Sequence, residues 1–265
     1  MSILAKILEQ KKIEIAMLDA QALRHAAASS PSPRDFLSAV REEGVRLIAE
    51  LKRASPSKGV LAPHLDLFQV ADLYAQNGAA AISVLTDEKY FLGSLETLRQ
   101  LRFERQIELP MLRKDFIIDA SQIYQSRLNG ADAILLIAAA LRDDVLLANL
   151  HALALELGLT PLVEVHNEAE TERALKIPGL RLIGINNRNL ATFEVTLETT
   201  ERLRPMIPDH IAVVAESGIF TASNVQRLAK ANVDGILVGE ALVTSEDIPA
   251  KVRELSGIAS QQSKV

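Results

Sequence analysis

From residue 46 onward, short apolar runs alternate with amphipathic segments of helical spacing, and the alternation repeats eight times. The runs are rich in Val, Ile and Leu, and several are apolar throughout, which is typical of strands buried on both faces of a parallel sheet. The predicted strands are Arg46–Leu51, Ala80–Leu85, Pro110–Arg113, Ala133–Ile137, Pro161–Val165, Leu182–Ile185, Ile211–Ala215 and Asp234–Val238.

Helical segments separate these runs. Ser94 can cap the start of one helix, and Gly78 and Gly130 stand just after two others, where helices commonly end. The predicted helices are Leu67–Gln76, Leu95–Phe103, Ser121–Leu128, Asp143–Leu157, Glu168–Leu175, Glu198–Leu203 and Ala222–Ala229.

Eight strand–helix units in 265 residues predict an α/β fold, the closed (β/α)8 or TIM barrel, because that fold has this composition and size. An open doubly wound sheet is the alternative. It usually has fewer strands and a glycine-rich nucleotide turn, and neither GxGxxG nor the P-loop pattern occurs. We expect residues 1–265 to form one barrel domain, with 1–45 as an N-terminal helical extension that closes one end of the barrel.

Composition removes several functional classes. The chain has no cysteine, which excludes disulfides, thiolate zinc sites and a cysteine nucleophile, and its five histidines lack metal-ligand spacing, so we expect no metal. A net charge of −5 without a basic tail argues against nucleic acid as a partner. The amino terminus mixes Lys and Glu into an apolar pattern, unlike a signal peptide, and the longest apolar run, 133–141, is too short to cross a bilayer. We therefore expect a cytoplasmic protein without a membrane partner. The sequence leaves the oligomeric state open, and we slightly favour a monomer.

Polar residues interrupt or follow six of the eight predicted strands at the same end. A single such charge is usually a solvated loop residue, but scattered surface charges have no reason to gather at one end. Because active sites of these barrels lie at the carboxyl ends of the strands, the set predicts an active site. It comprises Glu50, Lys52, Lys114, Glu164, Asn186, Arg188, Glu216, Ser217, Gly239 and Glu240.

Two glycine-containing turns predict a phosphate site. Ser217-Gly218-Ile219 follows the seventh strand, and Gly239-Glu240-Ala241 follows the eighth and opens a short helical turn. Glycine lets backbone N–H groups approach an anion, and the loops after strands seven and eight commonly hold phosphate in these barrels. The residues alone thus indicate an enzyme that uses lysine and glutamate for acid–base chemistry on a phosphorylated small molecule.

Several ordered motifs extend this interpretation. They are IAELKRASPSKG at 48–59, MLRKDFI at 111–117, PLVEVH at 161–166, IGINNRNL at 183–190, AESGI at 215–219 and GILVGEAL at 235–242. With these motifs the chain resembles the indole-3-glycerol phosphate synthase family over nearly its whole length. The resemblance implies conversion of 1-(2-carboxyphenylamino)-1-deoxyribulose 5-phosphate to indole-3-glycerol phosphate, carbon dioxide and water in tryptophan biosynthesis, without a cofactor.

The resemblance also implies roles for individual residues. Lys114 resembles the general acid that protonates the ketone oxygen, and Glu164 the carboxylate that assists proton transfer. Lys52, paired with Glu50, is similar to the lysine that handles the substrate carboxylate and later proton steps. The substrate-positioning residues implied are Asn186, Arg188, Glu216 and Ser217. The phosphate-binding set is Ser55, Gly218, Gly239 and the Glu240 backbone. The apolar wall around the aromatic ring is Phe91, Phe116, Leu135 and Leu190.

We also expect the two lysines of the cavity to ease proton release from one another, because a neighbouring cation disfavours the charged form of a lysine. Three alternatives remain at this point: a Schiff-base aldolase using Lys114 or Lys52, a sugar-phosphate isomerase, and a non-catalytic barrel that binds a phosphorylated ligand. The amino-terminal helix could be a cap on the barrel or a lid over the site.

Overall fold

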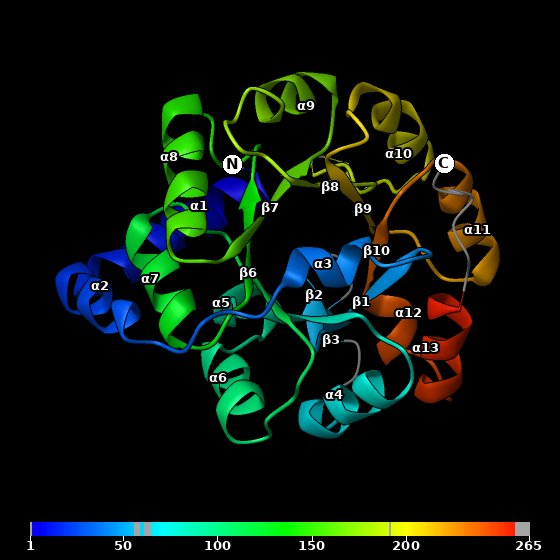
Figure 1. Ribbon diagram of the computed structural model, residues 1–265, viewed down its shortest axis with the longest axis horizontal. Coiled ribbons are helices and arrows are strands. Elements are labelled where there is room, and N and C mark those ends of the chain that lie inside the picture. The colour runs from blue at the N-terminus through cyan, green and yellow to red at the C-terminus, as the bar shows by residue number, and fades with distance from the viewer. Residues whose placement is uncertain (1, 56–58, 61–64, 191, 258–265) are drawn as a thin grey trace.

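Eight parallel strands close into a barrel in the computed structural model, which describes residues 2–55, 59–60, 65–190 and 192–257. The strand order around the barrel is β1-β10-β9-β8-β7-β6-β5-β4 (Figure 1). The fold is the predicted (β/α)8 barrel, and every predicted strand is present with its ends within one residue. The strands are β1 (Arg46–Leu51), β4 (Ala81–Leu85), β5 (Met111–Lys114), β6 (Ala133–Ile137), β7 (Thr160–Val165), β8 (Leu182–Asn186), β9 (Ala212–Glu216) and β10 (Gly235–Val238).

Helices surround the barrel, and side-chain caps define where many of them begin. Ser94 accepts a hydrogen bond from the Glu96 N–H, as its position predicts. Asp143 caps α8 in the same way, and the predicted helix is therefore one residue too long at that end. The helices after β1 are α4 (Leu67–Gln76), α5 (Glu88–Phe91), α6 (Leu95–Phe103), α7 (Ala120–Leu128), α8 (Asp144–Glu156), α9 (Glu168–Ala174), α10 (Glu198–Leu203), the 3-10 turn η1 (Arg204–Met206), α11 (Ala222–Lys230), α12 (Glu240–Val243) and α13 (Ile248–Ser256).

Apolar side chains form two buried layers. One layer lies between the strands and the outer helices, and the other fills the interior of the barrel. Interior positions include Ile48, Leu112, Leu162 and Val214, each two residues before a polar residue of the predicted site. Since alternate residues of a strand face the same side, Glu50, Lys114, Glu164 and Glu216 are the next inward-facing positions toward the carboxyl ends. The interior thus changes from apolar to polar at that rim.

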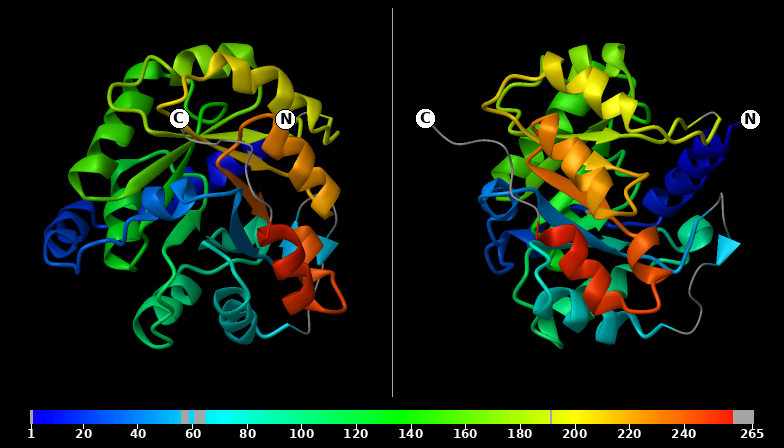
Figure 2. Two further views of the ribbon diagram at one scale, coloured as in Figure 1. Left: turned by 45° about the vertical axis from the view of Figure 1, so that its right-hand side comes forward. Right: turned by 90° about the vertical axis from the view of Figure 1, so that its right-hand side faces the viewer.

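The residues before β1 form three helices, α1 (Ile3–Ala16), α2 (Ala20–Ala28) and α3 (Phe36–Arg41). Phe36 and Val40 of α3 are buried against the interior apolar cluster, so α3 closes the amino-terminal end of the barrel. The prediction that all of 1–45 closes one end is wrong for α1, whose residues lie at the other end. Helix α2 packs against α7. Helix α1 lies on the opposite side of the barrel from α2 and α3 (Figure 2), and its residues line the cavity at the carboxyl ends of the strands.

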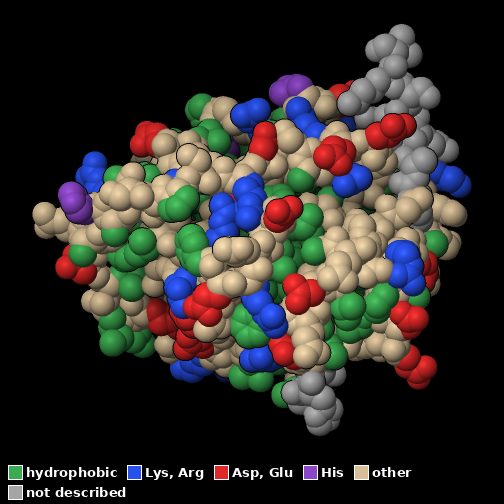
Figure 3. All heavy atoms as spheres, turned by 60° about the horizontal axis from the view of Figure 1, so that its bottom comes forward, with side chains coloured by type: hydrophobic (Ala, Val, Ile, Leu, Met, Phe, Trp, Pro, Cys, Tyr) green, Lys and Arg blue, Asp and Glu red, His purple; other side chains and the backbone are tan. Residues whose placement is uncertain are grey.

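Two further features bear on partners. On the face shown in Figure 3, acidic and basic side chains are interspersed rather than gathered into a continuous basic area. None of the helices in the described part of the chain is long and apolar enough to cross a bilayer.

A two-stranded antiparallel pair that the sequence did not predict, β2 (Ala54–Ser55) and β3 (Gly59–Val60), follows β1.

Candidate active site

A cavity opens at the carboxyl ends of the strands, and almost the whole predicted site lines it. The side chain of Ser55 lies outside the described residues. The other predicted residues that line the cavity are Glu50, Lys52, Phe91, Lys114, Phe116, Leu135, Glu164, Asn186, Arg188, Leu190, Glu216, Ser217, Gly218, Gly239 and Glu240. The structure therefore brings together residues from distant parts of the chain, as expected where parallel strands share one rim.

Lys114 stands at the centre of the polar part of the cavity. Its ammonium nitrogen lies 3.4 Å from an oxygen of Glu216 and 3.6 Å from an oxygen of Glu164. All three side chains are largely withdrawn from solvent. In the same cavity, the ammonium of Lys52 lies 3.5 Å from a Glu50 oxygen. The site therefore consists of two lysines, each beside a carboxylate, in a confined space.

The surrounding carboxylates determine the charge of Lys114. Burial disfavours its charged form, but the negative charges of Glu216, Glu164 and Glu50 outweigh burial and hold the pKa of Lys114 above its ordinary value. The expectation that a second lysine would ease proton release from Lys114 is thus wrong, because the charges of the nearby carboxylates outweigh burial. Lys114 is an ammonium at neutral pH and has a proton to donate.

The two carboxylates beside Lys114 differ in protonation. Burial favours the neutral form of both, but Lys114, His166 and Asn186 hold the pKa of Glu164 below its usual range. For Glu216, burial together with the charges of Glu164 and Glu50 exceeds the effect of Lys114 and raises the pKa. Two carboxyl groups whose environments separate their pKa values are suited to different acid–base roles. These shifts favour an ionised Glu164 and a protonated Glu216.

Two glycines leave room for the carboxylates of Glu216 and Glu50. A Cβ on Gly184 would lie 2.3 Å from a Glu216 oxygen, and a Cβ on Gly239 would lie 2.6 Å from a Glu50 oxygen. The sequence assigned Gly239 to phosphate binding alone. The structure adds a steric reason for glycine at this position, since any side chain there would displace Glu50.

The turn after β9 has left-handed backbone conformations, which suit the close approach of its N–H groups to an anion. Ser217 and Gly218 both have positive φ values, 66° and 79°, and Thr221 then caps α11. After β10, Gly239 precedes α12 directly. The two turns thus occupy neighbouring positions on the rim, as their order in the sequence predicts.

The apolar wall of the cavity is larger than the sequence indicated. The rings of Phe91 and Phe116 have centroids 6.0 Å apart. Further apolar residues line the cavity, and the sequence analysis missed them: Ile3, Leu4, Ile7, Leu85, Ile137, Phe193, Phe220 and Leu237. For α1 the sequence left open a cap on the barrel or a lid over the site, because an amphipathic pattern does not reveal which surface a helix covers; its residues line the cavity.

His166, which the sequence did not place in the predicted site, contacts Glu164. Its Nε2 lies 3.1 Å from a Glu164 oxygen, and its Nδ1 lies 3.0 Å from a Glu170 oxygen. The spacing of two between Glu164 and His166 was the available signal. Among the described residues, no cluster of His, Asp and Glu could hold a metal ion.

A (β/α)8 barrel with ammonium groups and carboxylates of separated pKa at its carboxyl rim defines an acid–base enzyme acting on a small molecule. Residues 4–255 match the family model for indole-3-glycerol phosphate synthase. The chain belongs to the indole-3-glycerol phosphate synthase family.

Relatives of the same description cover almost the full length. The chain is 51% identical to indole-3-glycerol phosphate synthase of Roseiflexus sp. (strain RS-1), over 97% of this chain and 98% of that one. It is 52% identical to that of Dehalococcoides mccartyi (strain ATCC BAA-2266 / KCTC 15142 / 195), over 84% and 86%.

Solved structures support the fold. Similar ones include 3-hexulose-6-phosphate synthase from Salmonella typhimurium, with a TM-score of 0.60 and 14% identity over 80% of this chain and 97% of that one. Thiamine phosphate pyrophosphorylase from Pyrococcus furiosus has a TM-score of 0.56 and 18% identity over 82% and 95%.

Proposed function

We propose that this protein converts 1-(2-carboxyphenylamino)-1-deoxyribulose 5-phosphate into indole-3-glycerol phosphate, carbon dioxide and water, in tryptophan biosynthesis. Membership of the family supports this reaction. The observation that carries the mechanism is the position of Lys114 between an anionic Glu164 and a protonated Glu216. Such a group can donate a proton while a neighbouring group accepts one.

In the first step, the ring carbon that bears the carboxylate attacks the ketone carbon, and a new carbon–carbon bond forms. Lys114 donates its proton to the ketone oxygen, which becomes a hydroxyl. The carboxylate then leaves as carbon dioxide, and the bonding electrons restore the aromatic ring. No oxidation or reduction occurs, so these steps need only proton transfer.

In the second part, the hydroxyl leaves as water after protonation, and a proton leaves the adjacent carbon to complete the indole. Glu164 assists proton transfer in ring closure or in this dehydration, and Lys52 holds the substrate carboxylate and serves later proton steps. The sugar and the carboxylate of the substrate are positioned by Asn186, Arg188, Glu216 and Ser217. Acid–base groups placed in this way each raise the reaction rate ~10²–10⁴-fold.

Binding of the two ends of the substrate positions the reacting atoms between them. The phosphate is held by Ser55, Gly218, Gly239 and the backbone of Glu240, and the aromatic ring lies against Phe91, Phe116, Leu135 and Leu190. Binding energy from a non-reacting group such as the phosphate can be used to orient the ring and the ketone. The apolar wall and the turns after β9 and β10 line one cavity, which fits a substrate with an aromatic end and a phosphate end.

The raised pKa of Lys114 argues against this lysine as the nucleophile of a Schiff-base aldolase, because a lysine must be neutral to attack a carbonyl. We further propose that residues 1–265 act as one domain and as a monomer in the cytoplasm. One chain supplies every residue of the proposed site, and α1 and α3 pack at opposite ends of the same barrel. Sedimentation velocity would measure the assembly state.

The direct test mixes the purified protein with the carboxyphenylamino-deoxyribulose phosphate, without added metal or cofactor, and follows indole fluorescence. Lys114→Ala should lose nearly all turnover, whereas Lys230→Ala, on an exposed helix position far along the chain, should not. Borohydride added during turnover should not inactivate the wild type. Binding without product formation would reject the catalytic assignment in favour of a binding protein.

A further inference from the structure

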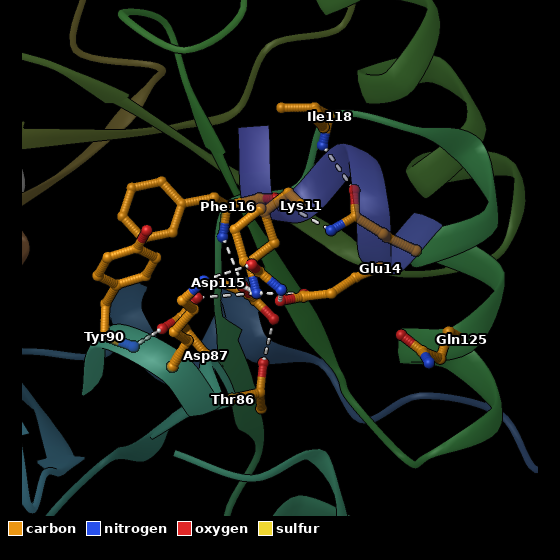
Figure 4. A network of polar contacts seen from close by, with 12 residues as sticks. Lys11, Glu14, Thr86, Asp87, Tyr90, Asp115, Phe116, Ile118 and Gln125 are labelled. Carbon is orange, nitrogen blue, oxygen red and sulfur yellow. Dashed lines mark hydrogen bonds and ion pairs between the residues drawn. The ribbon is translucent and has the colours of Figure 1, made fainter. Parts of the chain in front are cut away.

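We infer that Lys11 is a positioning residue: its ammonium ties α1 to the ends of β4 and β5 and thereby assembles the apolar wall that receives the aromatic ring. This inference rests on the proposed function for the identity of the ring. Figure 4 shows Lys11 reaching from α1 toward Asp87 and Asp115. Neither the sequence nor the acid–base mechanism above assigns Lys11 a role.

The ammonium of Lys11 is fully engaged. It lies 2.9 Å from an oxygen of each of Glu14, Asp87 and Asp115, and the residue is 2% exposed. A lysine ammonium has three donors and no acceptor, and of these three ion pairs the one with Glu14 is also a hydrogen bond. Glu14 belongs to α1 itself, whereas Asp87 and Asp115 follow β4 and β5. The contact therefore joins the amino-terminal helix to two neighbouring strands of the barrel.

Cations and carboxylates alternate around Lys11 and Asp115. Asp115 also accepts hydrogen bonds from Thr86 (2.6 Å) and from Arg113 (3.0 Å). Burial would raise the pKa of Asp115, but Arg113 and Lys11 outweigh burial and lower it to about 2. Burial would lower the pKa of Lys11, and the surrounding carboxylates raise it well above its usual range instead. Both shifts favour the charged forms of Lys11 and Asp115, so this buried pair acts as a fixed anchor and not as a pH switch.

The two aspartate partners of Lys11 each hold the backbone next to an aromatic residue of the apolar wall. Asp87 caps α5, accepting from the Tyr90 N–H at 2.7 Å, and α5 ends at Phe91. Asp115 stands directly between Lys114 and Phe116, and one of its oxygens accepts from the Phe116 N–H at 2.8 Å. One ammonium thus positions Phe91 and Phe116 through their backbones.

The helix itself contributes the third part of the wall. Ile3, Leu4 and Ile7 of α1 line the same cavity as Phe91 and Phe116. Two more exposed hydrogen bonds also join α1 to α5. The Lys89 ammonium donates to the Gln10 side chain at 2.7 Å, and the Tyr90 hydroxyl donates to the Lys6 carbonyl at 3.3 Å. Lys11 differs from these contacts because it is buried, and removing one partner of a buried charge cluster leaves the others uncompensated.

This geometry predicts a specific defect. Without the Lys11 ammonium, α1 and α5 lose their common anchor and the ring loses its wall, whereas the phosphate turns after β9 and β10 come from other strands. Lys11→Met keeps the length of the side chain and removes the charge. Lys12→Met is the matched control, because Lys12 is the neighbouring residue, is exposed, and pairs only with Glu9 among the ion pairs of the described residues.

The experiment measures kcat and KM for the substrate, together with the inhibition constant of inorganic phosphate. We expect Lys11→Met to raise KM at least tenfold, with a smaller change in kcat and an unchanged phosphate inhibition constant, and Lys12→Met to match the wild type. Lys11→Arg, which retains a cation, should recover part of the affinity. An unchanged KM, or an equal loss of substrate and phosphate affinity, would overturn the inference.

Two measurements keep the inference testable if Lys11→Met folds poorly or if the proposed reaction fails. Asp87→Asn still caps α5 but removes one charge from Lys11, and it should raise KM in the same direction by a smaller factor. Amide hydrogen exchange of α1 needs no turnover. It should accelerate at least tenfold in the Lys11 variant relative to the Lys12 variant, with α11 unchanged. Equal exchange of α1 in both variants would reject the anchor even if the wild type makes product.

Discussion

Nε2 of His166 lies 3.1 Å from an oxygen of Glu164, and the opposite ring nitrogen lies 3.0 Å from an oxygen of Glu170. Burial would lower the pKa of His166, but the two carboxylates outweigh burial and raise it to about 10. The ring is therefore an imidazolium at neutral pH. It places a positive charge beside Glu164 on the side away from Lys114 and helps to keep that carboxylate ionised.

Replacing His166 with Gln should raise the pKa of Glu164, because an adjacent cation lowers the pKa of a carboxyl group and its removal reverses the effect. The acidic limb of the pH profile of kcat/KM should move to higher pH. Glu170→Gln should move it in the same direction by less, and His25→Gln, an exposed control, should leave it in place. A superimposable acidic limb in the His166 variant would contradict this reading of the contact.

Glu164 and Glu216 should respond differently to the same substitution. Glutamine imitates a protonated carboxyl group and cannot accept a proton. Since Glu216 holds a proton in the free protein and Glu164 does not, Glu164→Gln should lower kcat by ~10²-fold or more, and Glu216→Gln by less than about tenfold. Steady-state kinetics at neutral pH would compare them, each serving as the other's isosteric control. Equal losses would show that the protonation states are assigned wrongly.

Gly239→Ala should lower activity more than stability. The added methyl group would lie 2.6 Å from an oxygen of Glu50 and must displace that side chain, which lies beside Lys52. We expect kcat/KM to fall at least tenfold and the free energy of unfolding to fall by about 1–2 kcal/mol, as for modest overpacking. Urea unfolding and kinetics measure the two effects. Gly257→Ala, at the end of α13, is the control, and full activity of Gly239→Ala would mean that Glu50 can move without consequence.

His151 should make the protein less stable in mild acid. The side chain is buried, neither ring nitrogen has a hydrogen-bond partner in the described structure, and burial lowers the pKa of His151 to about 4. Because the folded pKa lies below the unfolded value of about 6.5, the unfolded state binds the proton first and stability falls as pH decreases through this window. His151→Leu should remove up to about 2 kcal/mol of the loss between pH 7 and pH 5. Urea titrations at both pH values test this, and an equal pH dependence in both proteins would exclude His151 as its source.

Local patterns in the sequence determined the fold and most of the rim. Hydrophobic periodicity and capping residues are properties of short segments, so strands such as β6 and helices such as α4 could be placed within one residue. Once the strands are parallel, their carboxyl ends must share one rim, which is why Glu50, Lys114 and Glu164 could be grouped in advance.

Only the tertiary structure decided the charges of the site and the place of α1. The pKa of Lys114 depends on its distances to carboxylates on other strands, and no spacing along the chain contains those distances. The same holds for Lys11, whose partners Asp87 and Asp115 are remote in sequence. An amphipathic pattern states that a helix has an apolar face, but the packing of the whole chain decides that the face of α1 lines the cavity.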